Sequence, residues 1–153
     1  MLTIGSPIPD VTLKGPDGRD FPLRSLRGRE TVLFFYPKDD SPICTKEACS
    51  FRDSYEDFLA MGAEVVGISD DDADSHRRFA QRWSLPFTLL TDEGGKARNA
   101  FGIGRFLGVL KGRATFVVDR DGIIRAVIDD RFRARAHVQQ ALESLRAQRA
   151  AKV

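Results

Sequence analysis

The sequence predicts one α/β domain, residues 1–153, in which helices flank a central mixed β-sheet. Its length of 153 residues suits a single domain with its own core, and its hydrophobic share of 42% is ordinary for a globular protein. Short β-type runs alternate with amphipathic helical patterns, which is the order of α/β proteins. Near the end of the chain an Asp-Gly pair separates two β-type runs, and this favours an antiparallel hairpin.

The chain opens with a predicted hairpin, followed by a predicted central strand. Val11–Leu13 and Phe21–Leu23 flank the turn-forming run Gly15-Pro-Asp-Gly18. The apolar run Thr31–Tyr36, which ends at Pro37, is typical of a strand buried on both faces. We therefore expect an N-terminal hairpin extension beside a central sheet.

Helical and β-type segments alternate through the middle of the chain. From Lys46 to Leu59 apolar residues recur at helical spacing and predict one stripe on one helix. The stripe consists of Ala48, Phe51, Tyr55, Phe58 and Leu59. The next segments are predicted as strand Glu64–Ser69, helix Ala73–Trp83, strand Phe87–Leu90, helix Gly95–Phe101 and a glycine-rich loop over 102–108.

The last part of the chain predicts a hairpin and a helix. Ala114–Asp119 and Ile123–Ile128 flank the Asp-Gly turn, and Val138, Ala141, Leu142 and Leu145 lie on one helical face. Strand–helix–strand units followed by a hairpin and a helix are the thioredoxin-type arrangement. The predicted fold is therefore thioredoxin-like, with parallel strands first, an antiparallel pair at one edge and helices on both faces.

Charge and hydropathy exclude several functional classes. Lys and Arg number 24 against 22 Asp and Glu, and a net charge of +2 is too balanced for a dedicated nucleic-acid protein. No apolar run approaches the roughly 20 residues that span a bilayer, and the first residues lack a signal-peptide pattern. Two cysteines do not make a disulfide framework. We expect a cytoplasmic protein that binds neither nucleic acid nor membrane and carries no metal or cofactor.

Cys44 lies where a thiolate is favoured. Ser41-Pro42 is a typical helix start, since Ser is a preferred N-cap and Pro a preferred first helical residue. Cys44 then falls in the first turn, where backbone N–H groups and the positive end of the helix dipole stabilise an anion. Ser41 lies one turn back, so its hydroxyl can approach the sulfur or a small ligand beside it.

Cys49 is too far along the same helix to bond Cys44 directly. Five helical residues place the two Cα atoms roughly 8–9 Å apart, beyond the limit of about 7 Å for a disulfide. A bond between the sulfurs requires the first turns to unwind, which suits a transient disulfide. The spacing fits equally well two unrelated thiols, one of them buried. A zinc site lacks paired Cys-x-x-Cys and nearby histidines, and a thioredoxin-type dithiol would need Cys-x-x-Cys.

The run from Pro37 to Cys49 resembles a known family. Pro37-x-x-x-Ser41-x-x-Cys44 matches the peroxiredoxin active-site pattern Pro-x-x-x-(Thr/Ser)-x-x-Cys. The chain is similar to the subgroup called bacterioferritin-comigratory protein or peroxiredoxin Q. The similar segments are Gly5–Asp10, Phe35–Asp40, Cys44–Cys49, Leu85–Leu90 and Gly112–Asp119.

This resemblance implies a thioredoxin-dependent thiol peroxidase that reduces hydrogen peroxide and organic hydroperoxides in antioxidant defence. Cys44 would be the peroxidatic nucleophile that becomes a sulfenic acid. Cys49 would be the resolving cysteine that closes an intramolecular disulfide, which thioredoxin or a similar dithiol would reduce. Ser41 would bond the peroxide or the sulfur, and Arg113 would stabilise the thiolate and orient the peroxide. Backbone N–H groups at Ile43 and Cys44 are further candidate donors.

The resemblance also gives roles to Pro37, which would shield the pocket, and to Glu47, which would hold Arg113. It implies a monomer, with a weak dimer as the alternative. The chain departs from the family in having Ser41 for the usual threonine and Ile43 for the glycine frequent in this subgroup. A bulky Ile43 would slow unwinding or restrict larger hydroperoxides.

Two other functions compete with peroxidase activity. One is thiol–disulfide exchange, and the other is a redox-responsive interaction protein or holdase whose helix unwinds on oxidation and exposes Phe51 or Tyr55. Turnover separates them, because a peroxidase consumes many peroxides per chain. The two histidines, His76 and His137, are interpreted as packed or partly exposed residues without a chemical role, and Trp83 as part of the core.

Overall fold

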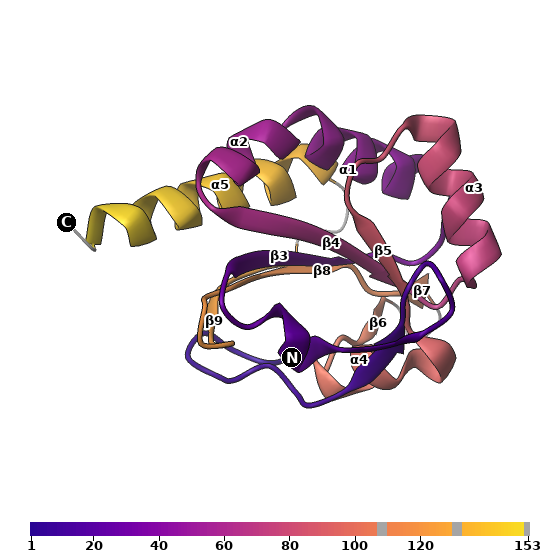
Figure 1. Ribbon diagram of the computed structural model, residues 1–153, viewed down its shortest axis with the longest axis horizontal. Coiled ribbons are helices and arrows are strands. Elements are labelled where there is room, and N and C mark those ends of the chain that lie inside the picture. Colours follow the sequence, from indigo (N-terminus) through magenta and orange to yellow (C-terminus); the bar gives the residue numbers. More distant parts are fainter. Residues whose placement is uncertain (107–109, 130–132, 152–153) are drawn as a thin grey trace.

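A seven-stranded mixed sheet with helices on both faces forms the body of the molecule (Figure 1). The computed structural model describes residues 1–106, 110–129 and 133–151. The strand order is β2-β1-β5-β4-β3-β8-β9. The strands are β1 (Thr12–Lys14), β2 (Asp20–Pro22), β3 (Glu30–Phe35), β4 (Ala63–Ser69), β5 (Thr88–Thr91), β8 (Ala114–Val118) and β9 (Ile124–Ile128).

The sheet has a parallel centre and antiparallel edges. β3 pairs in parallel with β4, and β4 with β5, whereas β8 runs antiparallel to both β3 and β9. The N-terminal hairpin joins the opposite edge, where Lys14 of β1 pairs with Thr91 of β5. The predicted thioredoxin-like fold, its edge hairpin and its N-terminal hairpin are confirmed, although β1 and β2 are shifted by one residue from the predicted runs.

Two apolar cores cover the two faces of the sheet. On one face Val32 and Phe34 of β3 pack with residues of α1 (Pro42–Asp53), α2 (Tyr55–Ala60), α3 (Ala73–Trp83) and α5 (Ala134–Ala151). On the other face Leu33 and Phe35 pack with residues of the 3-10 turn Leu23–Leu26 and of α4 (Lys96–Ala100), which follows the 3-10 turn Glu93–Gly95. Alternate residues of β3 thus enter opposite cores because successive strand side chains point to opposite faces. The predicted apolar face of α5 is confirmed, since Val138, Ala141, Leu142 and Leu145 are all buried.

The predicted single helix over 46–59 is wrong in one respect. α1 begins earlier, at Pro42, and the backbone leaves helical geometry at Ser54, where φ is −106° and ψ is 8°. A new short helix, α2, starts at Tyr55, so the register of the apolar stripe changes. As a result Phe58 is fully buried whereas Leu59, which the stripe placed inside, is 40% exposed.

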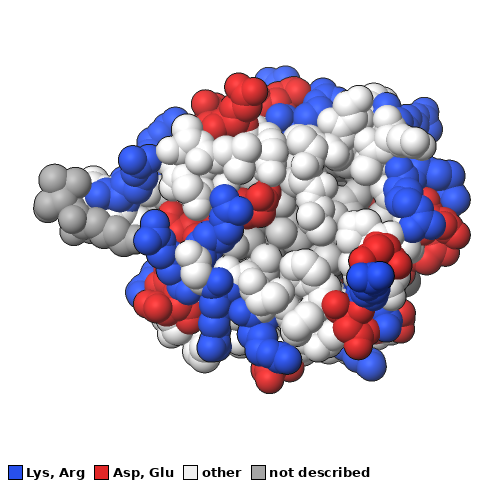
Figure 2. All heavy atoms as spheres, in the orientation of Figure 1, with Lys and Arg blue, Asp and Glu red and all other residues white. Residues whose placement is uncertain are grey.

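The region predicted as a glycine-rich loop contains a small hairpin. β6 (Arg105–Phe106) pairs antiparallel with β7 (Leu110–Lys111); residues 107–109 lie outside the described residues. Among the residues that the structure describes, no helix combines the length and apolar content needed to cross a membrane. Figure 2 shows basic and acidic side chains near one another over the viewed face, in keeping with the small net charge.

Candidate active site

The junction between β3 and α1 presents the cysteine-bearing turn. Ser41 is the N-cap residue of α1 and Pro42 its first residue, as predicted, and the Thr45 N–H donates to the Ser41 carbonyl at 2.8 Å. Amide groups 43 and 44 therefore lie in the first turn, where the helix itself supplies no acceptor. Just before this turn Asp40 adopts a left-handed conformation with φ of 63°, which Asp tolerates better than most residues.

Cys44 faces the interior rather than solvent. It is 1% exposed and packs in the core that α1, α3 and α5 form on one side of the sheet. Arg113 approaches it from the start of β8, and Arg113 Nη2 donates a hydrogen bond of 3.2 Å to Cys44 Sγ. A cation at the sulfur stabilises its thiolate form. The predicted neighbours Cys44 and Arg113 are thus brought together.

Gly112 lets Arg113 reach this position. A Cβ at Gly112 would lie 2.4 Å from the carbonyl oxygen of Gly104, so a larger residue would push the chain away. Arg98 of α4 fixes the same segment, since its Nη1 donates to the Gly112 carbonyl at 2.5 Å. Its Nη2 also donates to the Tyr36 carbonyl at 3.3 Å, which links the Arg113 segment to the end of β3.

Glu47 holds the guanidinium, as the resemblance implies. Glu47 is 0% exposed, and its Oε1 accepts from Arg113 Nη1 at 2.7 Å. Burial raises the pKa of Glu47, whereas the charges of His137 and Arg113 lower it. Burial alone would lower the pKa of Arg113, but Glu47 and Cys44 raise it above its ordinary value. The guanidinium therefore stays charged beside the sulfur.

His137 of α5 belongs to the same buried cluster. Its Nδ1 lies 3.4 Å from Glu47 Oε2 and 2.7 Å from the Thr115 hydroxyl oxygen. His137 is packed inside, as predicted, but the sequence pattern did not reveal that it contacts Glu47, the residue that orients Arg113. We call Glu47, Arg113, Thr115 and His137 the His137 cluster.

A second buried cluster fixes the loop before α1. Asp39 accepts from the Tyr36 hydroxyl at 2.6 Å and from the Ser75 hydroxyl at 2.8 Å, and lies 2.8 Å from His76 Nδ1. His76 Nε2 is 3.1 Å from the Leu90 carbonyl oxygen. His76 is packed inside, as predicted, but the sequence pattern did not reveal that Asp39 is its partner. We call Tyr36, Asp39, Ser75 and His76 the His76 cluster.

The structure places the Ser41 hydroxyl differently from the prediction and places Pro37 near the cysteine-bearing turn. The Ser41 hydroxyl donates to the Lys38 carbonyl at 3.0 Å and makes no cap hydrogen bond to α1. This hydroxyl therefore bonds a backbone oxygen of the preceding turn rather than the sulfur, and its approach to a small ligand stays a prediction. Pro37 is half-buried directly after β3, beside the loop that leads to Cys44.

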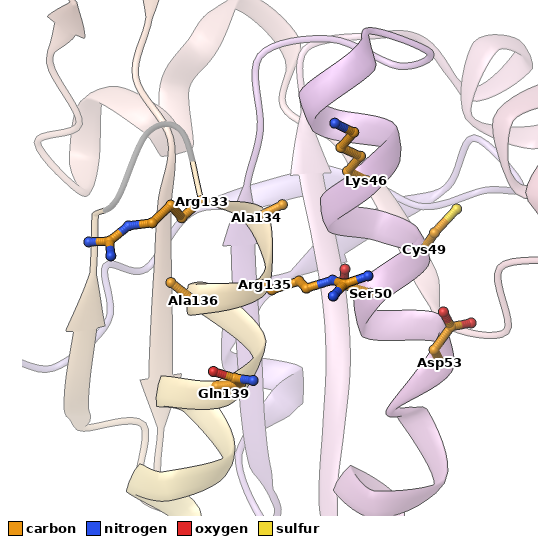
Figure 3. Close-up of a pocket in the computed structure, with 9 residues that line it drawn as sticks. All are labelled: Lys46, Cys49, Ser50, Asp53, Arg133, Ala134, Arg135, Ala136 and Gln139. Atoms are coloured by element: carbon orange, nitrogen blue, oxygen red, sulfur yellow. The ribbon is translucent and has the colours of Figure 1, made fainter.

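Cys49 lies on another side of α1 and is partly exposed. Both cysteines are free thiols. Burial raises the pKa of Cys49, Arg52 lowers it and Asp53 raises it. A hollow of about 710 Å³ lies between α1 and the start of α5, and Cys49 and Arg135 are among its lining residues. In Figure 3 the sulfur of Cys49 points away from α5, so this hollow does not bring a ligand to the sulfur.

Trp83, which was predicted to lie in the core, is partly buried and contacts the loop before α1. Its indole N–H donates to Asp40 at 3.1 Å, and its carbonyl accepts from Arg52 of α1 at 2.7 Å. No group of three His, Cys, Asp or Glu side chains suited to a metal ion occurs within 1–106, 110–129 and 133–151. The assembled groups are a sulfur, a guanidinium, a carboxylate and an imidazole, which suit thiolate chemistry.

Comparisons with known proteins agree with this chemistry. A model of the AhpC/TSA family matches residues 4–127. The chain is 47% identical over 145 residues to "Peroxiredoxin Q, chloroplastic" from Sedum lineare, covering 94% of this chain and 78% of the relative. It is 48% identical over 142 residues to the protein of the same name from Suaeda salsa, covering 92% of this chain and 66% of the relative.

Solved structures of peroxiredoxins also resemble this chain over nearly its whole length. The peroxidoxin BcpB of Mycobacterium tuberculosis superposes with a TM-score of 0.88 at 38% identity, covering 96% of this chain and 98% of that one. The bacterioferritin comigratory protein of Xanthomonas campestris, whose structures concern its alkyl peroxide reduction activity, superposes with a TM-score of 0.85 at 27% identity. Here the coverage is 97% of this chain and 98% of the Xanthomonas chain.

Proposed function

This chain belongs to the AhpC/TSA family and is a thiol-dependent peroxidase, and we propose that Cys44 is the sulfur that attacks the peroxide. The observation that carries the proposal is the hydrogen bond of 3.2 Å from Arg113 to Cys44 Sγ inside the protein. Of the two cysteines, Cys44 has a guanidinium at its sulfur, whereas burial raises the pKa of Cys49 and disfavours its thiolate.

In the first step the Cys44 thiolate attacks one oxygen of the peroxide. The S–O bond forms, the O–O bond breaks, and the other oxygen leaves as an alcohol or water after taking a proton. The sulfur is oxidised to a sulfenic acid while the peroxide is reduced. Arg113 and the amide groups of residues 43 and 44 stabilise the charge that develops on the leaving oxygen. Ser41 joins them after its hydroxyl turns from the Lys38 carbonyl.

In the second step Cys49 resolves the sulfenic acid. Its thiolate attacks Cys44 Sγ, the S–S bond forms, the S–O bond breaks, and the oxygen leaves as water. Cys44 is 1% exposed and both cysteines belong to one unbroken helix, so α1 must open before the sulfurs meet. Opening of a helix end is a low-cost local transition. Pro37 shields the pocket until then.

A dithiol reductant then returns both cysteines to the thiol state by two exchange steps. We propose thioredoxin or a similar dithiol for this role, and hydrogen peroxide together with organic hydroperoxides as substrates. The alkyl peroxide reduction named for the Xanthomonas neighbour supports the second class. Because both cysteines lie on one chain, the cycle needs no second copy, so we propose a monomer, in the cytoplasm.

Intact-protein mass after one equivalent of peroxide tests the roles of the cysteines. The wild type should lose about 2 Da through one disulfide. Cys49→Ser should instead gain about 16 Da as a sulfenic acid, and Cys44→Ser should keep its mass. Retention of peroxide consumption by Cys44→Ser would refute the assignment. Many peroxides consumed per chain with thioredoxin and its reductase exclude a sensor or holdase that reacts once.

A further inference from the structure

We propose that His137 is a positioning residue for this peroxidase: it holds Glu47, which lies between the two cysteines, in the folded turn and thereby aims Arg113 at Cys44. The inference rests on the proposed function, since it concerns the same sulfur. Neither the sequence motif nor the family pattern used above includes a residue from α5.

A chain of buried contacts joins His137 to the sulfur of Cys44. Arg113 donates to Cys44 Sγ at 3.2 Å and to Glu47 Oε1 at 2.7 Å. The other oxygen of Glu47 lies 3.4 Å from His137 Nδ1. Both Glu47 and His137 are 0% exposed, so water cannot replace either partner. The orientation of the guanidinium therefore depends on Glu47, and that of Glu47 on His137.

The surroundings of His137 Nδ1 show where its hydrogen lies. Its Nδ1 faces Glu47 Oε2 and the Thr115 hydroxyl oxygen, at 3.4 and 2.7 Å. A carboxylate oxygen only accepts, whereas a hydroxyl can accept or donate. When Nδ1 carries hydrogen, it can donate to the Thr115 hydroxyl and turn the same positive hydrogen toward Glu47 Oε2, whereas a bare ring nitrogen would set its lone pair against that carboxylate oxygen. His137 thus presents an N–H to Glu47.

Glu47 moves when α1 opens. Glu47 lies in the segment of α1 that must unwind before Cys44 can reach Cys49. If Glu47 leaves with this segment, Arg113 loses its buried anion, and the N–H of His137 keeps the Thr115 hydroxyl but loses the nearby carboxylate. An uncompensated buried charge is unfavourable. The His137 cluster therefore favours the folded turn, in which Cys44 meets peroxide, and opposes the open turn, in which Cys44 meets Cys49.

Two amide substitutions at one position provide a sharp test. In His137→Asn the side-chain amide occupies the place of Nδ1 and can still present an N–H toward Glu47 Oε2. In His137→Gln the amide extends toward the place of Nε2 and cannot present an N–H to Glu47. Two rate constants are measured: sulfenic acid formation in a Cys49→Ser background, and disulfide formation in the protein with both cysteines. The fluorescence of Trp83, the single tryptophan, follows the second step, because Trp83 contacts Asp40 and Arg52 on either side of the unwinding turn.

We expect His137→Gln to slow the first step and accelerate the second, each by about tenfold, a size typical of coupled neighbours. His137→Asn should lie close to wild type in both. The matched control is Val138→Ala, which weakens the packing of the next buried residue of α5 without touching Glu47. It should change both rate constants by less than about twofold. If His137→Gln does not fold, His137→Leu replaces it.

The outcomes separate the two proposals. If the wild type consumes peroxide through Cys44 but the Gln and Asn variants behave alike, His137 has no positioning role. If Val138→Ala produces the same opposite changes as His137→Gln, general packing of α5 explains them and the inference is overturned. If Cys44→Ser retains peroxidase activity, the proposed function itself fails.

Discussion

The two histidines of the chain lie in buried clusters that differ in construction. His76, from α3, joins Asp39 of the loop before α1, and Asp39 accepts from two hydroxyl groups as well. His137, from α5, joins Glu47 inside α1, where Glu47 Oε2 and Arg113 Nε lack hydrogen bonds. The His76 cluster thus satisfies its carboxylate fully, whereas the His137 cluster leaves two buried polar atoms unsatisfied.

This difference shows how one active site can combine a rigid part with a part that is released during the reaction. Asp39 precedes the cysteine turn, so we expect it to keep its partners while α1 opens. Glu47 lies within the turn and must exchange its partners in each cycle. A fully satisfied buried network is costly to break, and a partly satisfied one is easier to release. We therefore expect loss of the His76 cluster to lower stability and loss of the His137 cluster to change the balance of the two reaction steps.

The largest predicted effect is on stability. In His76→Leu the Asp39 carboxylate stays buried without its nitrogen partner, and the free energy of unfolding should fall by about 3–5 kcal/mol. Ser75→Ala, which removes one hydroxyl from the same carboxylate, should cost only about 1 kcal/mol. Urea unfolding at neutral pH measures both. Equal losses for the two variants would contradict the central place of His76 in the cluster.

The next prediction concerns coupling between Glu47 and His137. Each of Glu47→Gln and His137→Leu should slow sulfenic acid formation, but the double variant should be little slower than the worse single variant. We expect a coupling free energy of about 1–2 kcal/mol from the double-mutant cycle. Rate constants for all four proteins in the Cys49→Ser background give this value. Simple additivity of the two effects would place His137 outside the path to Arg113.

The sequence predicted the parts of the site that are local and missed those that depend on tertiary contacts. Cys44 follows from the helix start and the motif, Arg113 and Glu47 follow from the resemblance to the peroxiredoxins, and the structure places Arg113 in contact with the other two. His137 is 90 residues from Glu47 and reaches it only because α5 packs on α1; periodicity marks that face as apolar and reveals no partner. The Ser41 hydroxyl, expected to approach the sulfur or a small ligand, bonds the Lys38 carbonyl instead, because the helix-start pattern fixes the backbone of Ser41 but not the rotamer of its side chain.

The third prediction is a pH dependence of stability. Burial raises the pKa of Glu47, against the opposing charges of His137 and Arg113, so the folded protein binds this proton more tightly than the unfolded chain. The stability that protonated Glu47 contributes is fully present at pH values below its ordinary pKa of 4.5. It is lost as the pH rises through the higher pKa that Glu47 has in the folded protein. The free energy of unfolding of the wild type should therefore fall, relative to that of Glu47→Gln, as pH rises above 4.5. Urea unfolding of both proteins across this range measures the difference, and parallel curves would contradict it.

The smallest predicted effect concerns Cys49, which lies outside both clusters and serves as their reference. Burial raises the pKa of Cys49 above 9.0, with Arg52 lowering and Asp53 raising it. In a Cys44→Ser background, the rate of alkylation of Cys49 by iodoacetamide should therefore reach half its maximum above pH 9.0. Asp53→Asn should move this midpoint down and Arg52→Gln should move it up, because each removes one nearby charge. His137→Gln should leave the midpoint unchanged, since His137 acts through Glu47 and Arg113 on the other thiol. A midpoint that moved with His137 would mean that the His137 cluster controls the whole of α1 rather than the turn around Cys44.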